Sequence, residues 1–229
     1  MEIPETSLFP TPATAVSLVL ASASPARLKV LHGAGLRPVV RVSLVDEDAL
    51  LAQLRADGAE PAAQVLALAQ AKARAVAGEL EMSLSPGVDT LVMGCDSMLE
   101  FHGEVLGKPH NPEVALARVC ALAGDCGVLH TGHWVMRLRS DAAEPVAEVG
   151  RTESTVVHFA DFSEAEARAY VDSGEPLEVA GSFTIDGLGG AFISGIEGDP
   201  HNVIGISLPL LRTLTAERGI FWPSLWGNW

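Results

Sequence analysis

The stretch Leu91-Val92-Met93-Gly94-Cys95-Asp96-Ser97 decides the fold, because within it an apolar run ends on a carboxylate. Such a run is typical of a central strand in an α/β sheet, where both faces of the strand are buried. In these sheets ligands bind beyond the carboxyl ends of the strands, so we expect Asp96 to lie at that rim. Gly94 would allow a ligand to approach the backbone closely.

A second motif, Gly107-Lys108-Pro109, follows a few residues later and predicts a turn that presents one ammonium group. A carboxylate and an ammonium group in neighbouring loops indicate a phosphate site. Each motif also has an ordinary interpretation, with Asp96 as a turn or helix-capping residue and Lys108 in a solvated turn.

Composition favours a globular protein and limits its partners. The chain has 229 residues, 48% of them hydrophobic, which is enough for a substantial core. A net charge of −14, with only 15 lysine and arginine residues, argues against binding to long nucleic acid. The apolar runs are too short to cross a membrane and no signal peptide is recognisable, so we expect a cytoplasmic protein without a membrane partner. The three cysteines predict neither a disulfide framework nor a structural zinc site.

The first strand and helix indicate another anion site. Residues 1–15 are rich in proline, threonine and serine, so we expect a disordered lead-in followed by one α/β domain over residues 16–229. Residues 17–21 predict a buried strand, and Ser24 is expected to cap a helix that begins at Pro25. The turn over residues 22–27 then places hydroxyl and amide groups at a helix N-terminus, where anions bind. Ordinary Ser-Pro capping would explain the same residues.

Lys72 lies in the middle of an apolar stripe on the helix predicted from Pro61 to about Leu80. The stripe consists of Val65, Leu68, Ala69 and Val76. Two interpretations remain open for this lysine. Its stem could carry the ammonium group to the helix edge, or the ammonium group could be buried or face a cleft as part of a site.

The rest of the chain predicts further helices around a β-rich centre. Three strands are expected: one over 38–45, which runs into an acidic cluster at 46–48, and two over 131–139 and 152–159, which a hairpin or loop over 140–145 joins. Three helices are expected as well: one capped by Asn111, one begun by the capping box Ser163-x-x-Glu166, and a last one capped by Ser207. His130 and His133 would face opposite sides of a strand, which argues against joint metal ligation. The glycine-rich stretch 180–190 lacks dinucleotide-binding spacing but could shape a base pocket, and residues 198–202 predict a turn.

Several segments, taken in order, resemble the Maf family of nucleoside triphosphate pyrophosphatases, also described as septum-formation proteins. The matching segments are 18–25, 45–47, 71–73, 94–97, 107–109, Tyr170 with 174–176, 180–181 and 202–205. The resemblance implies an elongated, two-lobed α/β fold, with a mixed sheet flanked by helices and a central cleft, similar to inosine triphosphate pyrophosphatase.

The resemblance also implies hydrolysis of a nucleoside triphosphate to its monophosphate and pyrophosphate with a divalent cation, Mg²⁺ or Mn²⁺. The family's functional residues correspond here to Ser22, Arg27, Glu47, Lys72, Asp96 and Lys108. Among them Asp96 would be catalytic, Glu47 and Asp96 would hold the metal, and the others would bind substrate. A clearing role for non-canonical nucleotides and a homodimer are left open.

Three positions depart from the family pattern at residues that bear on recognition of the nucleotide base. Ala26 replaces the first arginine of the Ser-Pro motif, and Ser97 and Asp186 stand where the dTTP- and UTP-specific branch has threonine and glutamine. We expect Ser97 and Asp186 to contact the substrate, which we describe simply as a nucleoside triphosphate. One alternative is a narrow 7-methyl-GTP pyrophosphatase, whose branch shares the acidic residue before Gly-Leu-Gly. The others are a sugar or phosphomonoester hydrolase, and a non-catalytic protein that senses nucleotide or regulates division.

Overall fold

The computed structural model describes residues 16–81, 88–109, 111–139 and 146–227. The expected lead-in over 1–15 and the loop over 140–145 lie outside these residues. Among the described residues, no helix is both long enough and apolar enough to cross a bilayer. All three cysteines are free.

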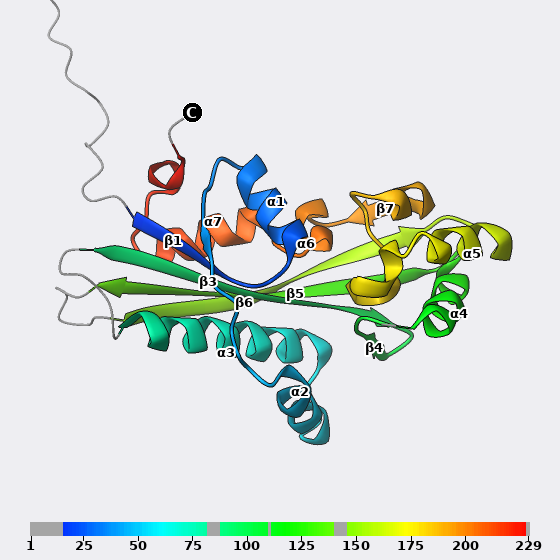
Figure 1. Cartoon of the computed structure of the whole chain (residues 1–229), viewed down its shortest axis with the longest axis horizontal. Helices are drawn as coiled ribbons and strands as arrows, with labels where there is room; N and C mark the ends of the chain where they lie inside the picture. The colour runs from blue at the N-terminus through cyan, green and yellow to red at the C-terminus, as the bar shows by residue number, and fades with distance from the viewer. Residues whose placement is uncertain (1–15, 82–87, 110, 140–145, 228–229) are drawn as a thin grey trace, which may run out of the picture.

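A mixed sheet of seven strands extends along the long axis of the described part of the molecule (Figure 1). The strands are β1 (Val16–Ala21), β2 (Val39–Val40), β3 (Asp89–Phe101), β4 (Glu104–Leu106), β5 (Cys126–Arg139), β6 (Val146–Phe159) and β7 (Ile193–Glu197). Their order is β2-β1-β3-β5-β6-β7, and β4 pairs with β3. The strands β1, β2 and β3 are parallel to one another, whereas all later pairings are antiparallel. The predicted α/β class with a mixed sheet is therefore confirmed.

Helices cover both faces of this sheet (Figure 1). They are α1 (Pro25–Gly33), α2 (Glu47–Ala56), α3 (Pro61–Glu81), α4 (Pro112–Leu122), α5 (Glu164–Asp172), α6 (Pro200–Ile204) and α7 (Leu208–Glu217), with 3₁₀ segments η1 (Glu175–Glu178), η2 (Ala180–Ser182), η3 (Leu188–Phe192) and η4 (Trp222–Leu225). Helix α3 lies along one face, whereas α1, α6 and α7 lie on the other. The two faces thus present different side chains of each strand.

Four predicted helix starts are confirmed, because local capping chemistry fixes each of them. Ser24, Asn111 and Ser207 each accept a hydrogen bond from the backbone of the first helical turn that follows. Ser163 and Glu166 form both halves of a capping box at the start of α5.

Other expected boundaries are wrong. The strand expected over 38–45 consists only of Val39 and Val40, since the residues after it leave the sheet, and Leu44 is 91% exposed. The acidic cluster at 46–48 is the start of a helix that was not predicted, with Asp46 as its N-cap. Residues 198–202 are not a simple turn, because Asp199 caps the short helix α6.

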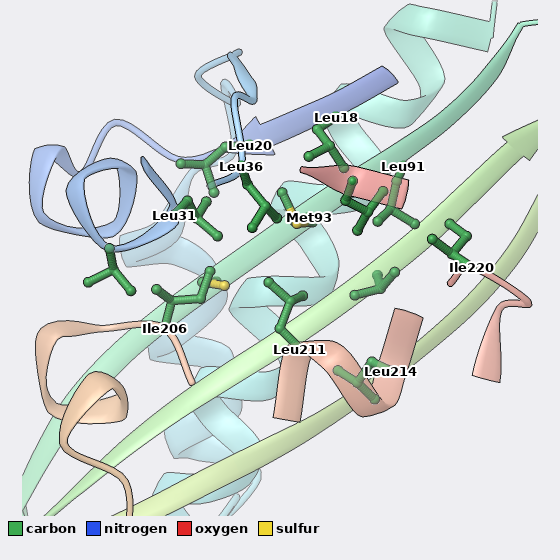
Figure 2. Close-up of a cluster of buried hydrophobic side chains, with 14 residues drawn as sticks. Leu18, Leu20, Leu31, Leu36, Leu91, Met93, Ile206, Leu211, Leu214 and Ile220 are labelled. Carbon is green, nitrogen blue, oxygen red and sulfur yellow. The ribbon is translucent and has the colours of Figure 1, made fainter. Parts of the chain in front are cut away.

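The main core lies between the sheet and the helices α1 and α7 (Figure 2). Leucines from β1, α1 and α7 meet Met93 of β3 there, and most of these side chains are fully buried. Burying each such side chain contributes about 1.5–3 kcal/mol. This core fixes α1, and therefore the turn that precedes it, against β3.

Candidate active site

The edge of β3 that faces β1 and β4 is interrupted in its middle. Along β3, the pairing with β1 ends at Gly94, which lies opposite Ala21, and the pairing with β4 starts at Leu99, which lies opposite Leu106. Residues 95–98 therefore have no strand partner on that side among the described residues, although β5 pairs with all of them on the other side. We call this stretch the open edge of β3. It contains Asp96, which was predicted at the end of the strand and lies instead near its middle, just beyond the end of β1.

Adjacent residues of the open edge point to opposite faces of the sheet, because successive strand side chains alternate. Asp96 meets the α3 side through Lys72, and Ser97 meets the α1 side through Arg27. Two clusters of functional groups therefore meet at the same place from opposite faces.

Helix α3 lies unusually close to the sheet beside the open edge. A Cβ atom on Gly94 would lie 2.2 Å from the carbonyl oxygen of Ala69, and one on Gly132 would lie 2.3 Å from that of Val65. The expectation that Gly94 admits a ligand is therefore wrong, since the space is filled by a helix. This close approach brings Lys72 against β3.

Lys72 forms the first cluster. Its Nζ lies 2.7 Å from Oδ1 of Asp96 and 2.7 Å from Oε2 of Glu47. Lys72 is 7% exposed and Asp96 8%, whereas the side chain of Glu47 is 49% exposed. The interpretation in which the stem carries the ammonium group of Lys72 to the helix edge is therefore wrong. Two carboxylates around one ammonium group leave one net negative charge.

Arg27 forms the second cluster. The guanidinium donates from Nε to the carbonyl of Gly205 at 2.7 Å, from one terminal nitrogen to Ser22 Oγ at 3.0 Å, and from the other to Ser97 Oγ at 2.9 Å. It is 8% exposed. No carboxylate lies within ion-pair distance of it among the described residues. A buried cation whose partners are all neutral is costly unless an anion binds, so this guanidinium favours an anionic ligand.

Ser97 extends the second cluster across the sheet. Its hydroxyl lies 2.9 Å from the hydroxyl of Thr131, which donates to the carbonyl of Asn202 at 3.1 Å. Asn202 is completely buried and holds α6 to β5 and β6 through its side-chain amide. The sequence reasoning missed the roles of Thr131 and Gly205. Only the resemblance had included the segment 202–205.

Two predicted substrate residues, both within the described part of the chain, form no hydrogen bond or ion pair with either cluster. Lys108 is exposed and has no hydrogen-bond or ion-pair partner among the described residues, although the carbonyl of Gly107 accepts from Arg118 at 2.8 Å. Asp186 forms an ion pair with Lys29 of α1 at 3.0 Å. Lys29 could not be singled out from the sequence, because a lysine on an exposed helix face is ordinary.

The two histidines of β5 have different partners, as expected for side chains that face opposite sides of a strand. His130 lies between Glu100 and Ser154, whereas His133 is fully buried, accepts from the backbone of Ser207 and contacts the carbonyl of Thr131. Burial, together with the positive charge of Arg27, lowers the pKa of His133 to about 4. In the part of the chain that the structure describes, no three histidine, cysteine or acidic side chains converge as metal ligands.

Cys95 also lies on the open edge, but it is not a candidate nucleophile. The side chain is completely buried. Burial raises the pKa of its thiol to about 11, so the reactive thiolate is scarce at neutral pH.

Comparison with known proteins identifies the family of this chain. The sequence matches the family described as Maf-like protein over residues 17–218. A protein of Nocardia farcinica (strain IFM 10152), named nucleoside triphosphate pyrophosphatase, is 55% identical over 92% of this chain and 96% of its own length. Proteins of the same name from Rhodococcus jostii (strain RHA1) and Leifsonia xyli subsp. xyli (strain CTCB07) are 51% and 48% identical, over 93% and 92% of this chain and 97% of each relative. The chain therefore belongs to the Maf-like protein family.

Proposed function

We propose that this protein is a nucleoside triphosphate pyrophosphatase, which hydrolyses the bond between the α and β phosphates. The names of its close relatives support this activity. The observation that carries it is the pair of buried cations at the open edge of β3: Lys72 balanced by carboxylates, and Arg27 without one. The proposal includes a cytoplasmic location, where nucleoside triphosphates are available, and leaves a homodimer open.

The two cations would take different parts in binding. Arg27 has neutral partners only, so it would receive phosphate oxygens without breaking an existing ion pair. Lys72 would exchange part of its contact with Glu47 or Asp96 for the substrate. A triphosphate carries about four negative charges at neutral pH, and neutralising them is the main requirement for attack at phosphorus. Ser22 and Ser97, which both accept from Arg27, would keep the guanidinium aimed at the ligand.

Asp96 would act as the general base. Water attacks the α-phosphorus, the bond to the bridging oxygen of the β-phosphate breaks, pyrophosphate leaves, and the proton of the water passes to a carboxylate oxygen of Asp96. Lys72, 2.7 Å away, would hold that carboxylate in place. Positioned general bases of this kind contribute roughly 10² to 10⁴ in rate.

Glu47 and Asp96 fit a divalent cation, Mg²⁺ or Mn²⁺. The two carboxylates lie close together, because Oε2 of Glu47 and Oδ1 of Asp96 each lie 2.7 Å from Nζ of Lys72. Mg²⁺ is commonly bound by one or two carboxylates together with substrate phosphates and water, so two carboxylates suffice. When bound, the cation would neutralise phosphate charge and lower the pKa of a coordinated water.

The remaining predicted residues would contact the ends of the substrate. Lys108, which is exposed and has no partner among the described residues, is free to reach a terminal phosphate. Asp186 lies on the α1 side of the sheet and would meet the nucleoside. Because Ala26, Ser97 and Asp186 depart from the pyrimidine-specific pattern, we propose acceptance of several bases.

The test is phosphate release from mixed triphosphates with Mg²⁺ or Mn²⁺ and added inorganic pyrophosphatase. Asp96→Asn should retain less than a tenth of the wild-type kcat/KM, a loss above about 1.4 kcal/mol of transition-state stabilisation. Asp172→Asn, an exposed change on α5, is the matched control and should keep full activity. Undiminished turnover in Asp96→Asn would remove the catalytic assignment. Release without the pyrophosphatase would indicate a phosphomonoester hydrolase, and binding without release a nucleotide sensor.

A further inference from the structure

The carboxylate of Glu175 organises the loop over residues 184–190. Oε1 accepts from Thr184 Oγ1 at 2.5 Å, from the backbone of Gly189 at 3.0 Å and from the hydroxyl of Tyr170 at 3.1 Å. Oε2 accepts from the backbone of Leu188 at 3.0 Å. Four donors from one loop and its supporting helix therefore converge on a single side chain.

The loop fits around this carboxylate so closely that it needs glycine. A Cβ atom on Gly187 would lie 2.5 Å from Oε2 of Glu175, and one on Gly189 would lie 2.5 Å from the hydroxyl of Tyr170. Consecutive backbone N–H groups around an anion form a nest, which is a rigid arrangement. The glycine-rich stretch thus binds an anion that belongs to the protein itself.

Glu175 remains a charged acceptor at neutral pH. Burial raises the pKa of its carboxyl, but hydrogen bonds from Thr184, Gly189, Leu188 and Tyr170 outweigh this effect and leave the pKa below its usual value. The nest therefore holds its anion throughout the neutral range.

The loop connects two parts of the candidate active site. Before it, η2 lies against β3 next to the open edge, since a Cβ atom on Gly181 would be 2.7 Å from Cβ of Leu99. Within it, Asp186 reaches α1 and pairs with Lys29 at 3.0 Å. The loop thus extends from the end of the open edge to the helix that carries Arg27.

The chemistry of the loop suits a nucleoside better than phosphate. Residues 184–190 contain no lysine or arginine, and Asp186 adds a negative charge that would repel a triphosphate. The cations that suit phosphate, Arg27 and Lys72, lie on other elements. A carboxylate and backbone groups can instead hydrogen-bond to an uncharged base.

We propose that Glu175 is a positioning residue for base selection, which acts by holding the loop over residues 184–190 against the nucleoside end of the substrate. This inference rests on the proposed pyrophosphatase function. It predicts that disturbing Glu175 changes the preference among bases and leaves phosphate recognition intact.

The experiment compares wild type, Glu175→Gln and the control Glu164→Gln, an exposed change of the same chemistry on α5. kcat/KM is measured for ATP, GTP, CTP, UTP and dTTP, and inorganic tripolyphosphate, which has no base, is measured as a competitive inhibitor. In Glu175→Gln the ratio between the best and poorest base should change at least tenfold, mainly through KM, while inhibition by tripolyphosphate stays within twofold. Glu164→Gln should match wild type.

A second variant keeps the proposal testable if Glu175→Gln folds poorly. Gly187→Ala leaves the carboxylate in place and displaces the loop, because the new Cβ would lie 2.5 Å from Oε2 of Glu175. It should produce the same change in base preference. An equal loss for all bases, a parallel loss of tripolyphosphate inhibition, or an unchanged base ratio would each overturn the proposal.

Failure of the proposed function gives a different result. If wild type releases no pyrophosphate from any triphosphate, the function is wrong. The same variants are then compared by the dissociation constants of non-hydrolysable triphosphate analogues. A base ratio that is unchanged in Glu175→Gln overturns the positioning role independently of turnover, whereas an altered ratio supports it.

Discussion

Replacing Lys72 with methionine removes a buried ammonium group and keeps a side chain of similar length. We expect the variant to be less stable at pH 7, even though methionine is the more hydrophobic residue. Asp96, 8% exposed, would keep its negative charge without the cation that now lies 2.7 Å away, and it would face Glu47 across the vacated position.

The size of the loss follows from the burial of each partner. Removing one member of a buried ion pair costs about 3–5 kcal/mol. The contact with Glu47 adds little, because its side chain is 49% exposed and exposed pairs contribute about 0–1 kcal/mol. We therefore expect a loss of about 3 kcal/mol in the free energy of unfolding. In a domain of this size that lowers Tm by about 6–12 °C.

The assay is urea and thermal unfolding of three variants beside wild type. Lys29→Met is the control, since its side chain is 72% exposed, and it should change stability by less than about 1 kcal/mol. The double variant Lys72→Met/Asp96→Asn should regain at least half of the loss, because no lone carboxylate is then buried. An unchanged or higher Tm in Lys72→Met alone would refute the arrangement of one ammonium group between two carboxylates.

Three further predictions concern the second cluster, the contact of α3 with the sheet, and pH. Arg27→Gln should raise KM for triphosphate at least tenfold in steady-state assays, and unchanged KM would show that the buried guanidinium does not meet substrate. Gly94→Ala should lower stability by about 1–3 kcal/mol, because its Cβ would meet the carbonyl of Ala69 at 2.2 Å, whereas Gly78→Ala on an open part of α3 should not. His133 has a folded-state pKa near 4 and an unfolded value near 6.5, so the unfolded chain binds the extra proton between these values. Stability should fall by about 3 kcal/mol as pH drops from 6.5 to 4, and equilibrium unfolding of His133→Gln over this range should lack that part of the decline.

Local sequence signals predicted the fold well where the deciding hydrogen bond lies within one helical turn. Ser24, Ser163 and Ser207 cap the helices they were expected to cap, since a cap depends only on the next three residues. Strand lengths were predicted poorly. Strand β3 continues through Asp96 and Ser97 because pairing with β5 holds its backbone, whatever the polarity of its side chains.

The candidate site was predicted less completely than the fold. A lysine on an apolar stripe was the one local signal for Lys72. Asp96 was indicated by the apolar run that ends on it, whereas Glu47 came from the resemblance alone, and neither carboxylate was predicted as a partner of Lys72. Thr131 and Gly205 were missed because their contacts with Ser97 and Arg27 join residues far apart in the chain. Glu175 was missed as the centre of a loop, because a glutamate after a helix end usually only faces solvent.

The hydrogen bond from Arg27 to the carbonyl of Gly205 joins residues separated by 178 positions. During synthesis the chain emerges from its N-terminus, so the guanidinium exists long before the group that orients it. The anion site can therefore form only after nearly the whole polypeptide has left the ribosome and folded. Contacts of such long sequence separation form slowly, because closing the loop between them costs chain entropy first. If Arg27 binds the nucleotide as proposed, recovery of nucleotide binding after refolding would report complete folding, and a chain that ends before residue 205 would lack the carbonyl that orients this guanidinium.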